Sequence, residues 1–166
     1  MFNHWPWYVL VMAIVNWVAV ERKLKWVEYI AKPGTMILLL IWIVSNADLG
    51  GALLWFVLGG VLSLFGDIFL MLPGNYFIPG LVSFLLAHVA YLIGFNVDGL
   101  LFNWQSVIFL AGIAAISFWL YSRLASAMKA KQQQALKLPV LIYVVVISLM
   151  VYSALMTGWR ANWSML

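Results

Sequence analysis

The sequence contains no cysteine, few charged residues and no extended polar segment. Without cysteine, a disulfide framework, a thiolate metal site and a cysteine nucleophile are all excluded. Charged residues make up 8% of the 166 residues, apolar residues make up 66%, and the mean hydropathy is +1.04. This composition is typical of an integral membrane protein and leaves no room for a separate soluble domain. We therefore predict a single membrane domain over residues 1–166.

The apolar residues fall into six runs that approach the length needed to cross a bilayer, about 20 residues. Each run is continuously apolar rather than alternating, which favours helices over the strands of a closed barrel. We therefore predict an all-α bundle of six transmembrane helices. Their approximate spans are 5–20, 33–47, 51–72, 77–95, 104–121 and 138–157.

The basic residues gather on one side of this predicted topology. Lys and Arg are enriched in cytoplasmic loops, so we predict that the 21–32 and 122–137 loops are cytoplasmic and that both chain ends lie outside. The basic loops are expected to lie near anionic lipid headgroups, and a nucleic-acid partner is not expected. Only Arg160 falls on the other side. The basic residues of the cytoplasmic side are Arg22, Lys23, Lys25, Lys32, Arg123, Lys129, Lys131 and Lys137.

Asp67 is an acid inside the third apolar run. A charged side chain there costs about 3 kcal/mol on insertion scales and usually faces the bundle interior, which makes it a candidate functional residue. The structural alternative is a packing seam with one tolerated acid, because Gly59, Gly60, Ser63 and Gly66 precede it at helical spacing. Asp67 lies about 7–8 Å before the cytoplasmic turn, a depth that water and a lipid headgroup can reach.

The fourth run carries His88 and Tyr91 on one helical face with Phe84 and Phe95. Such a stripe is more often packing than a cofactor site, and a lone histidine in a span is often structural. An imidazole and a phenol nevertheless need hydrogen-bond partners in a dry environment. The turn Leu72-Pro73-Gly74-Asn75 makes the third and fourth helices antiparallel neighbours, so His88 could donate to Asp67 or to its water. Neither a metal site nor a cofactor is predicted.

Lys32 and Tyr143 are placed near Asp67 by the same topology. Pro33 fits the first turn of a short second helix, which leaves Lys32 at the membrane edge. Its simplest role is an anchor of the cytoplasmic side, and its alternative role is to attract the phosphate of a ligand. Tyr143 lies near the cytoplasmic end of the sixth run, at the level of Lys32 and Asp67.

From about Lys32 to Ala154 the chain resembles the YhhN-like lysoplasmalogenases, which include animal enzymes and many bacterial inner-membrane proteins. Each motif alone is weak, and their order and spacing carry the resemblance. The motifs are Lys32-Pro33, Gly66-Asp67 with Leu70, Met71 and Leu72, Phe84-Leu85-Leu86-Ala87-His88 with Tyr91, and Pro139-Val140 with Tyr143 and Met150.

The resemblance implies a bundle of about eight membrane helices and hydrolysis of the vinyl ether bond of lysoplasmalogens, a lysophospholipid substrate. Asp67 would be catalytic, as the general acid or as the base that activates water, with support from His88 and Tyr91. Substrate binding would fall to Lys32, Asn75 and Tyr143. The resemblance also implies a second intramembrane aspartate after the sixth helix. This chain ends before it, so we expect a C-terminally incomplete form.

Two other classes of protein stay open. A small transporter or channel subunit would also hold an aspartate and a histidine inside a bundle, but no internal repeat or pair of broken helices is seen in the sequence. A non-catalytic lipid-binding membrane protein is the simpler alternative. Release of aldehyde from lysoplasmalogen would distinguish the enzyme from both.

Overall fold

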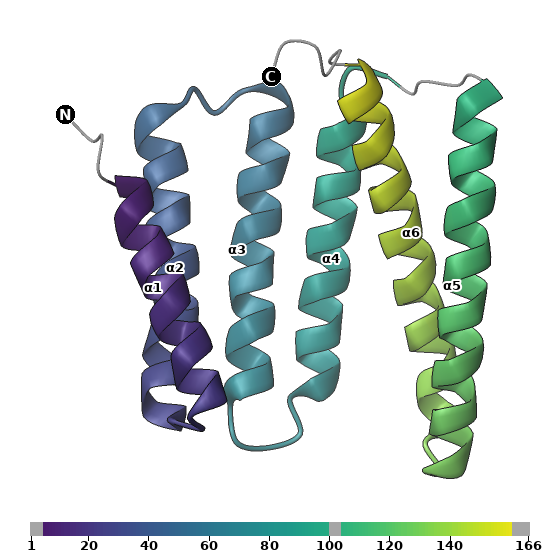
Figure 1. Cartoon of the computed structure of the whole chain (residues 1–166), viewed down its shortest axis with the longest axis horizontal. Helices are drawn as coiled ribbons and strands as arrows, with labels where there is room; N and C mark the ends of the chain where they lie inside the picture. Colours follow the sequence, from purple (N-terminus) through teal and green to yellow (C-terminus); the bar gives the residue numbers. More distant parts are fainter. Residues whose placement is uncertain (1–4, 100–103, 161–166) are drawn as a thin grey trace. The chain divides into compact units, whose positions relative to one another are not determined.

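The computed structural model describes residues 5–99 and 104–160, which form six α-helices and one short 3₁₀-helix (Figure 1). No strand occurs among these described residues, so the predicted all-α fold is confirmed. The physical reason is that helices pair their main-chain groups internally, as a lipid environment demands. The two chain ends, which the orientation prediction places outside the cell, fall outside the described residues.

The six helices follow one another with short connections. Five of them, α2 to α6, have the length and apolar composition of a membrane span. With 17 residues α1 is shorter, at about 26 Å, although it is equally apolar. The elements are α1 (Trp5–Glu21), α2 (Lys25–Asn46), α3 (Gly51–Met71), α4 (Phe77–Asn96), α5 (Trp104–Ala130), η1 (Gln134–Leu136) and α6 (Lys137–Arg160).

Large apolar side chains cover the outside of the helices, while small residues fill the contacts between them. Trp26 and Phe118 are 85% and 75% exposed, whereas Ala31 and Ala87 are buried. An aqueous surface rarely carries so much exposed apolar area. The distribution is instead typical of helices that face lipid with large side chains and one another with small ones.

The chain divides within α4, after Ala90, into two compact units. The first contains α1, α2, α3 and most of α4, and the second contains the last turns of α4 with α5 and α6. Of the predicted site residues, Lys32, Asp67, Asn75 and His88 belong to the first unit, whereas Tyr91 and Tyr143 belong to the second. The single domain predicted for the whole chain stays a prediction.

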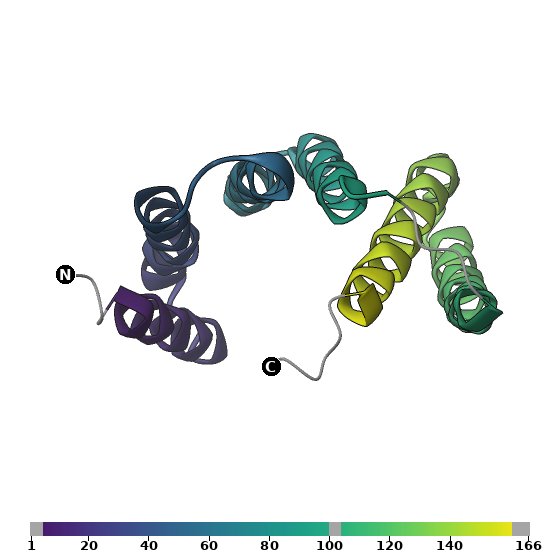
Figure 2. The same ribbon diagram turned by 90° about the horizontal axis from the view of Figure 1, so that it is seen from above.

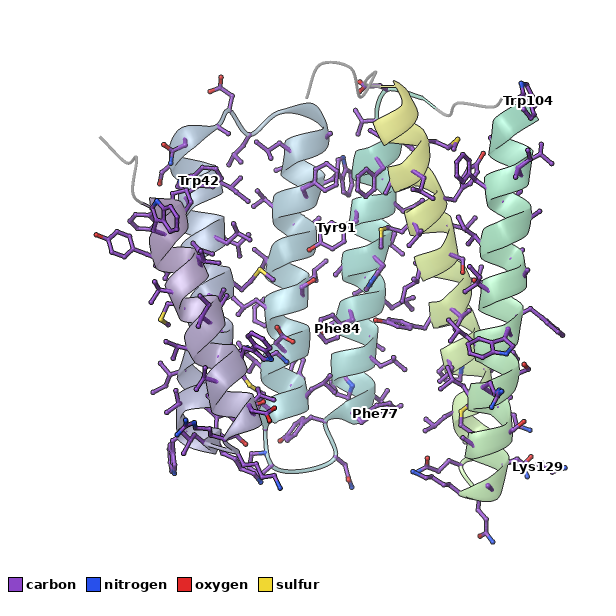
Figure 3. The ribbon with its side chains drawn as sticks, viewed as in Figure 1. Trp42, Phe77, Phe84, Tyr91, Trp104 and Lys129 are labelled. Carbon is purple, nitrogen blue, oxygen red and sulfur yellow. The ribbon has the colours of Figure 1, made fainter. Side chains whose placement is uncertain are left out.

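In the first unit α3 lies between α2 and α4 (Figure 2). A Cβ atom on Gly60 would lie 2.8 Å from Cδ2 of Leu40 in α2, and one on Gly66 would lie 2.7 Å from the ring of Phe84 in α4 (Figure 3). The small residues before Asp67 therefore lie in a packing seam, and at Gly66 the ring of Phe84 occupies the space that a side chain would need. The buried residues of the seam are Gly59, Gly60, Ser63 and Gly66.

The turn predicted between the third and fourth helices is also present. Gly74 has a φ of +132°, a conformation that L side chains rarely adopt. Tyr76 stacks on Phe69 across the turn, with the ring centroids 6.4 Å apart. These features hold α3 and the start of α4 as an antiparallel pair.

Polar contacts between helices hold the second unit together. Ser117 of α5 and Ser148 of α6 share a hydrogen bond of 2.6 Å. The amide of Asn96 in α4 donates to the hydroxyl of Ser153 in α6 at 2.8 Å, and the Thr157 hydroxyl donates to the main-chain oxygen of Phe95 at 2.9 Å. Such hydrogen bonds are a common way to join helices whose outer surfaces are apolar.

Two helices extend beyond the predicted spans. We expected Pro33 in the first helical turn, but α2 begins at Lys25 and Pro33 lies inside it, so that position was wrong. Proline has no main-chain N–H, so the helix lacks the hydrogen bond that residue 33 would otherwise donate to the carbonyl of Tyr29. With 22 residues α2 covers about 33 Å and is not short. Likewise α5 continues to Ala130, which places Lys129 on a helix end rather than in a loop (Figure 3).

Candidate functional site

The ammonium group of Lys32 on α2 forms an ion pair with the carboxylate of Asp67 on α3. Nζ lies 2.8 Å from Oδ1, and the two side chains are 34% and 16% exposed. The contact joins two helices of the first unit, and both charged side chains are partly buried. A carboxylate in this setting is stabilised by its partner, because opposite charges attract more strongly in a medium of low dielectric constant.

The direction of the two helices explains why these side chains meet. Lys32 lies about 10 Å from the start of α2 and Asp67 about 6 Å from the end of α3. The start of α2 and the end of α3 lie at the same end of this antiparallel pair (Figure 1). Helical side chains lean toward the N-terminus of their own helix. The side chain of Lys32 therefore points toward that end of the pair, and the side chain of Asp67 points away from it. The two charged groups thus come to a similar height along the helices.

A cavity of about 260 Å³ lies on the same two helix faces, closer to the helix ends. Lys25, Glu28 and Tyr29 share a face of α2 with Lys32, at spacings of three and four residues. Leu70 and Met71 share a face of α3 with Asp67 in the same way. The cavity residues are Lys25, Glu28, Tyr29, Leu70 and Met71.

A hydrogen bond between two of the lining residues joins the helices at this cavity. The Tyr29 hydroxyl donates to the main-chain oxygen of Met71, the last residue of α3. Carbonyls in the last turn of a helix receive no hydrogen bond from their own helix. Here a side-chain donor satisfies one of them. The contact ties the start of α2 to the end of α3 beside the charged lining residues.

His88 makes a hydrogen bond within its own helix. Its Nδ1 donates to the main-chain oxygen of Phe84, one turn earlier on α4. Because a carbonyl only accepts, Nδ1 carries the proton in this hydrogen bond. Among the described residues, the partner of the Asp67 carboxylate is Lys32. The predicted role of His88 in orienting Asp67 stays a prediction.

The other predicted site residues lie in different surroundings. Asn75 is exposed in the turn after α3, at the same end of that helix as the cavity. Tyr91 and Tyr143 are half-buried in the second unit. Their proposed parts in substrate binding and catalysis stay predictions. Among the described residues there is no group of three or more His, Asp or Glu side chains that could hold a metal ion.

Sequence reasoning missed the part that Lys25, Glu28 and Tyr29 play in lining a cavity. They were assigned to a cytoplasmic loop, because Pro33 was taken to start the second helix. The signal was present in their spacing of three and four residues up to Lys32, which is helical. It becomes meaningful only once α2 is known to begin at Lys25.

Comparison with known proteins agrees with the motifs. The model of the YhhN family matches residues 27–166, a range that contains Lys32, Asp67 and every other predicted site residue. No curated protein and no solved structure matches the chain.

Proposed function

The chain belongs to the YhhN family, and we propose that it is a membrane-embedded hydrolase of the lysoplasmalogenase type. Its substrate would be a lysoplasmalogen, and its products would be a fatty aldehyde and glycerophospho-ethanolamine or glycerophospho-choline. The observation that carries the proposal is the ion pair of Lys32 and Asp67, which holds a carboxylate between two apolar helices. A charged group in such a place is expected to serve function rather than stability.

The proposed reaction consumes one water molecule. A proton adds to the alkenyl carbon remote from the ether oxygen, and the neighbouring carbon becomes part of an oxocarbenium ion. Water adds to that cationic carbon and gives up a proton to a base. In the hemiacetal the bond between this carbon and the glycerol oxygen then breaks. The hydroxyl proton passes in net terms to the glycerol oxygen, which leaves the aldehyde and a glycerol hydroxyl group as products.

The ion pair favours one of the two roles expected for Asp67. In the pair the group is a carboxylate, so it is suited to accept the proton of the attacking water and to stabilise the oxocarbenium charge. Lys32 contacts Oδ1 of Asp67, and Oδ2 is proposed to accept a hydrogen bond from the water. The resemblance implies a second intramembrane aspartate for the protonation step. His88 and Tyr91 are proposed to orient the water, and Asn75 and Tyr143 to contact the substrate.

We infer that the protein lies in a bacterial inner membrane with its basic loops in the cytoplasm, because Lys and Arg gather at one end of the predicted topology. The ion pair and the cavity of the first unit lie toward the end of α2 and α3 that carries Lys25. The substrate headgroup would then approach from the cytoplasmic leaflet.

The deciding experiment measures aldehyde released from a lysoplasmalogen by membranes that contain the protein. A lysolipid with a saturated ether in place of the vinyl ether serves as the control substrate, because it has no alkenyl carbon to protonate. The hydrolase is supported if aldehyde is released from the lysoplasmalogen and not from the control lipid, and if Asp67→Asn abolishes that release. Lipid binding without any aldehyde would support the non-catalytic lipid-binding protein.

A further inference from the structure

We propose that the cavity between the start of α2 and the end of α3 binds the zwitterionic phosphoamine headgroup of a lysophospholipid. Lys25 would contact the phosphate and Glu28 the ammonium group. This inference rests on the proposed function, because it states where the headgroup of that substrate lies.

Both signs of charge line the cavity. Lys25 is exposed and Glu28 is half-buried, and among the described residues the two form no ion pair with each other. A site for a simple anion would gain nothing from a carboxylate in its wall. A group that carries a phosphate and an ammonium a few bonds apart is matched by one cation and one anion set a single helical turn apart.

The remaining lining suits the uncharged parts of such a headgroup. Tyr29 is one of the lining residues, and aromatic side chains are the usual protein partners of alkylated ammonium groups. Leu70 and Met71 offer apolar contacts to methylene groups. The volume of about 260 Å³ equals that of several water molecules at about 30 Å³ each. The cavity is therefore large enough for a phosphoamine group.

The position of the cavity relative to Asp67 supports the same ligand. Leu70 and Met71 follow Asp67 by about one helical turn, or 5.4 Å. In a lysoplasmalogen the three glycerol carbons separate the vinyl ether from the phosphate. A headgroup bound in the cavity would therefore leave the reacting bond at the level of Asp67 and Lys32.

Binding of lysolipids that cannot be hydrolysed tests the assignment without catalysis. The two probes are a saturated-ether lysolipid with a phosphoethanolamine headgroup and the same lipid ending in phosphate, each measured on purified protein in detergent. We expect the wild type to bind the phosphoethanolamine lipid about tenfold more tightly, a difference of about 1.4 kcal/mol. Glu28→Gln should abolish this preference, whereas Lys25→Gln should weaken binding of both lipids by about tenfold.

Matched controls come from the end of α1 and the turn that follows it. Glu21→Gln and Lys23→Gln remove the same charges from exposed residues that do not line the cavity, so both dissociation constants should be unchanged. If Glu28→Gln cannot be purified, Glu28→Ala removes the same charge and gives the same measurement.

The outcomes separate this inference from the proposed function. An unchanged preference in Glu28→Gln overturns the headgroup site, even if the wild type releases aldehyde from lysoplasmalogen. Loss of the preference in Glu28→Gln supports the site, even if no aldehyde is released from any substrate. In that second case the hydrolase proposal fails and a binding site for zwitterionic lysolipids remains.

Discussion

Nζ of Lys32 lies 2.8 Å from Oδ1 of Asp67, and this pair connects α2 to α3. The lysine was expected to attract a phosphate, yet its partner in the structure is the carboxylate that is proposed to catalyse. Lys25 lies on the same face of α2, about two helical turns nearer the helix start, and is therefore the better candidate for the phosphate. We therefore propose that the charged residues form a reacting pair, Lys32 with Asp67, and a headgroup pair, Lys25 with Glu28.

Asp67→Asn should abolish vinyl ether hydrolysis while the protein stays folded. The amide keeps the shape of the side chain but cannot accept the proton of the attacking water. General acid–base contributions are commonly 10²–10⁴-fold in rate, so kcat should fall by about that factor. Asp48→Asn is the control, since Asp48 is exposed in the connection between α2 and α3. Retention of more than about a tenth of kcat would show that Asp67 is a packing residue.

Lys32 and Asp67 should be strongly coupled in stability. Lys32→Met leaves a largely buried carboxylate without its partner, so it should destabilise the protein by about 1–3 kcal/mol. In the double variant Lys32→Met with Asp67→Asn no charge remains, and most of that loss should be recovered. The measurement is the free energy of unfolding of the wild type, both single variants and the double variant in detergent. Strictly additive effects would contradict the coupling.

The two lysines on this face of α2 should differ in kinetics. Lys32→Ala should lower kcat, because the ammonium holds the carboxylate of Asp67 in place. Lys25→Ala should chiefly raise KM, because a headgroup contact contributes equally to the ground state and the transition state. Steady-state kinetics with a lysoplasmalogen substrate measure both constants. The same pattern of change in the two variants would argue against the division into a reacting pair and a headgroup pair.

Gly66 should be far less tolerant of a side chain than Gly112. A Cβ on Gly66 would lie 2.7 Å from the Phe84 ring, so Gly66→Ala should destabilise the protein by about 1–3 kcal/mol. Gly112 on α5 has nothing within 4 Å of its Cβ position, so Gly112→Ala should be neutral or slightly stabilising. Thermal unfolding in detergent compares them. Equal stability of the two variants would show that α3 and α4 do not approach closely at Gly66.

The orientation can be tested against a clean background, because the chain has no cysteine of its own. Lys131→Cys should stay unlabelled by a membrane-impermeant thiol reagent in intact cells, since the positive-inside rule puts this exposed turn in the cytoplasm. Asp48→Cys should be labelled, because Asp48 lies in the connection between α2 and α3, at the opposite end of α2 from the basic residues. Labelling of Lys131→Cys and protection of Asp48→Cys would reverse the orientation.

Much of the fold could be predicted because its causes are local. The length and continuity of the apolar runs determine helices in lipid, where each main-chain group needs a partner within its own segment. The turn at Leu72 to Asn75 follows from proline and glycine chemistry, and the seam of small residues before Asp67 follows from helical spacing. The start of α2 was missed because proline usually marks the beginning of a helix, whereas here it lies inside one.

The amino-acid sequence was enough to predict an apolar, all-helical chain, the hairpin of α3 and α4, and one acid within an apolar segment. That Lys32 pairs with this acid, and that Lys25, Glu28 and Tyr29 line a cavity beside it, follows from the packing of the helices. Contacts between helices depend on their rotation and register. Those are set by close approaches such as Gly60 to Leu40 and Gly66 to Phe84, which no single segment of sequence specifies.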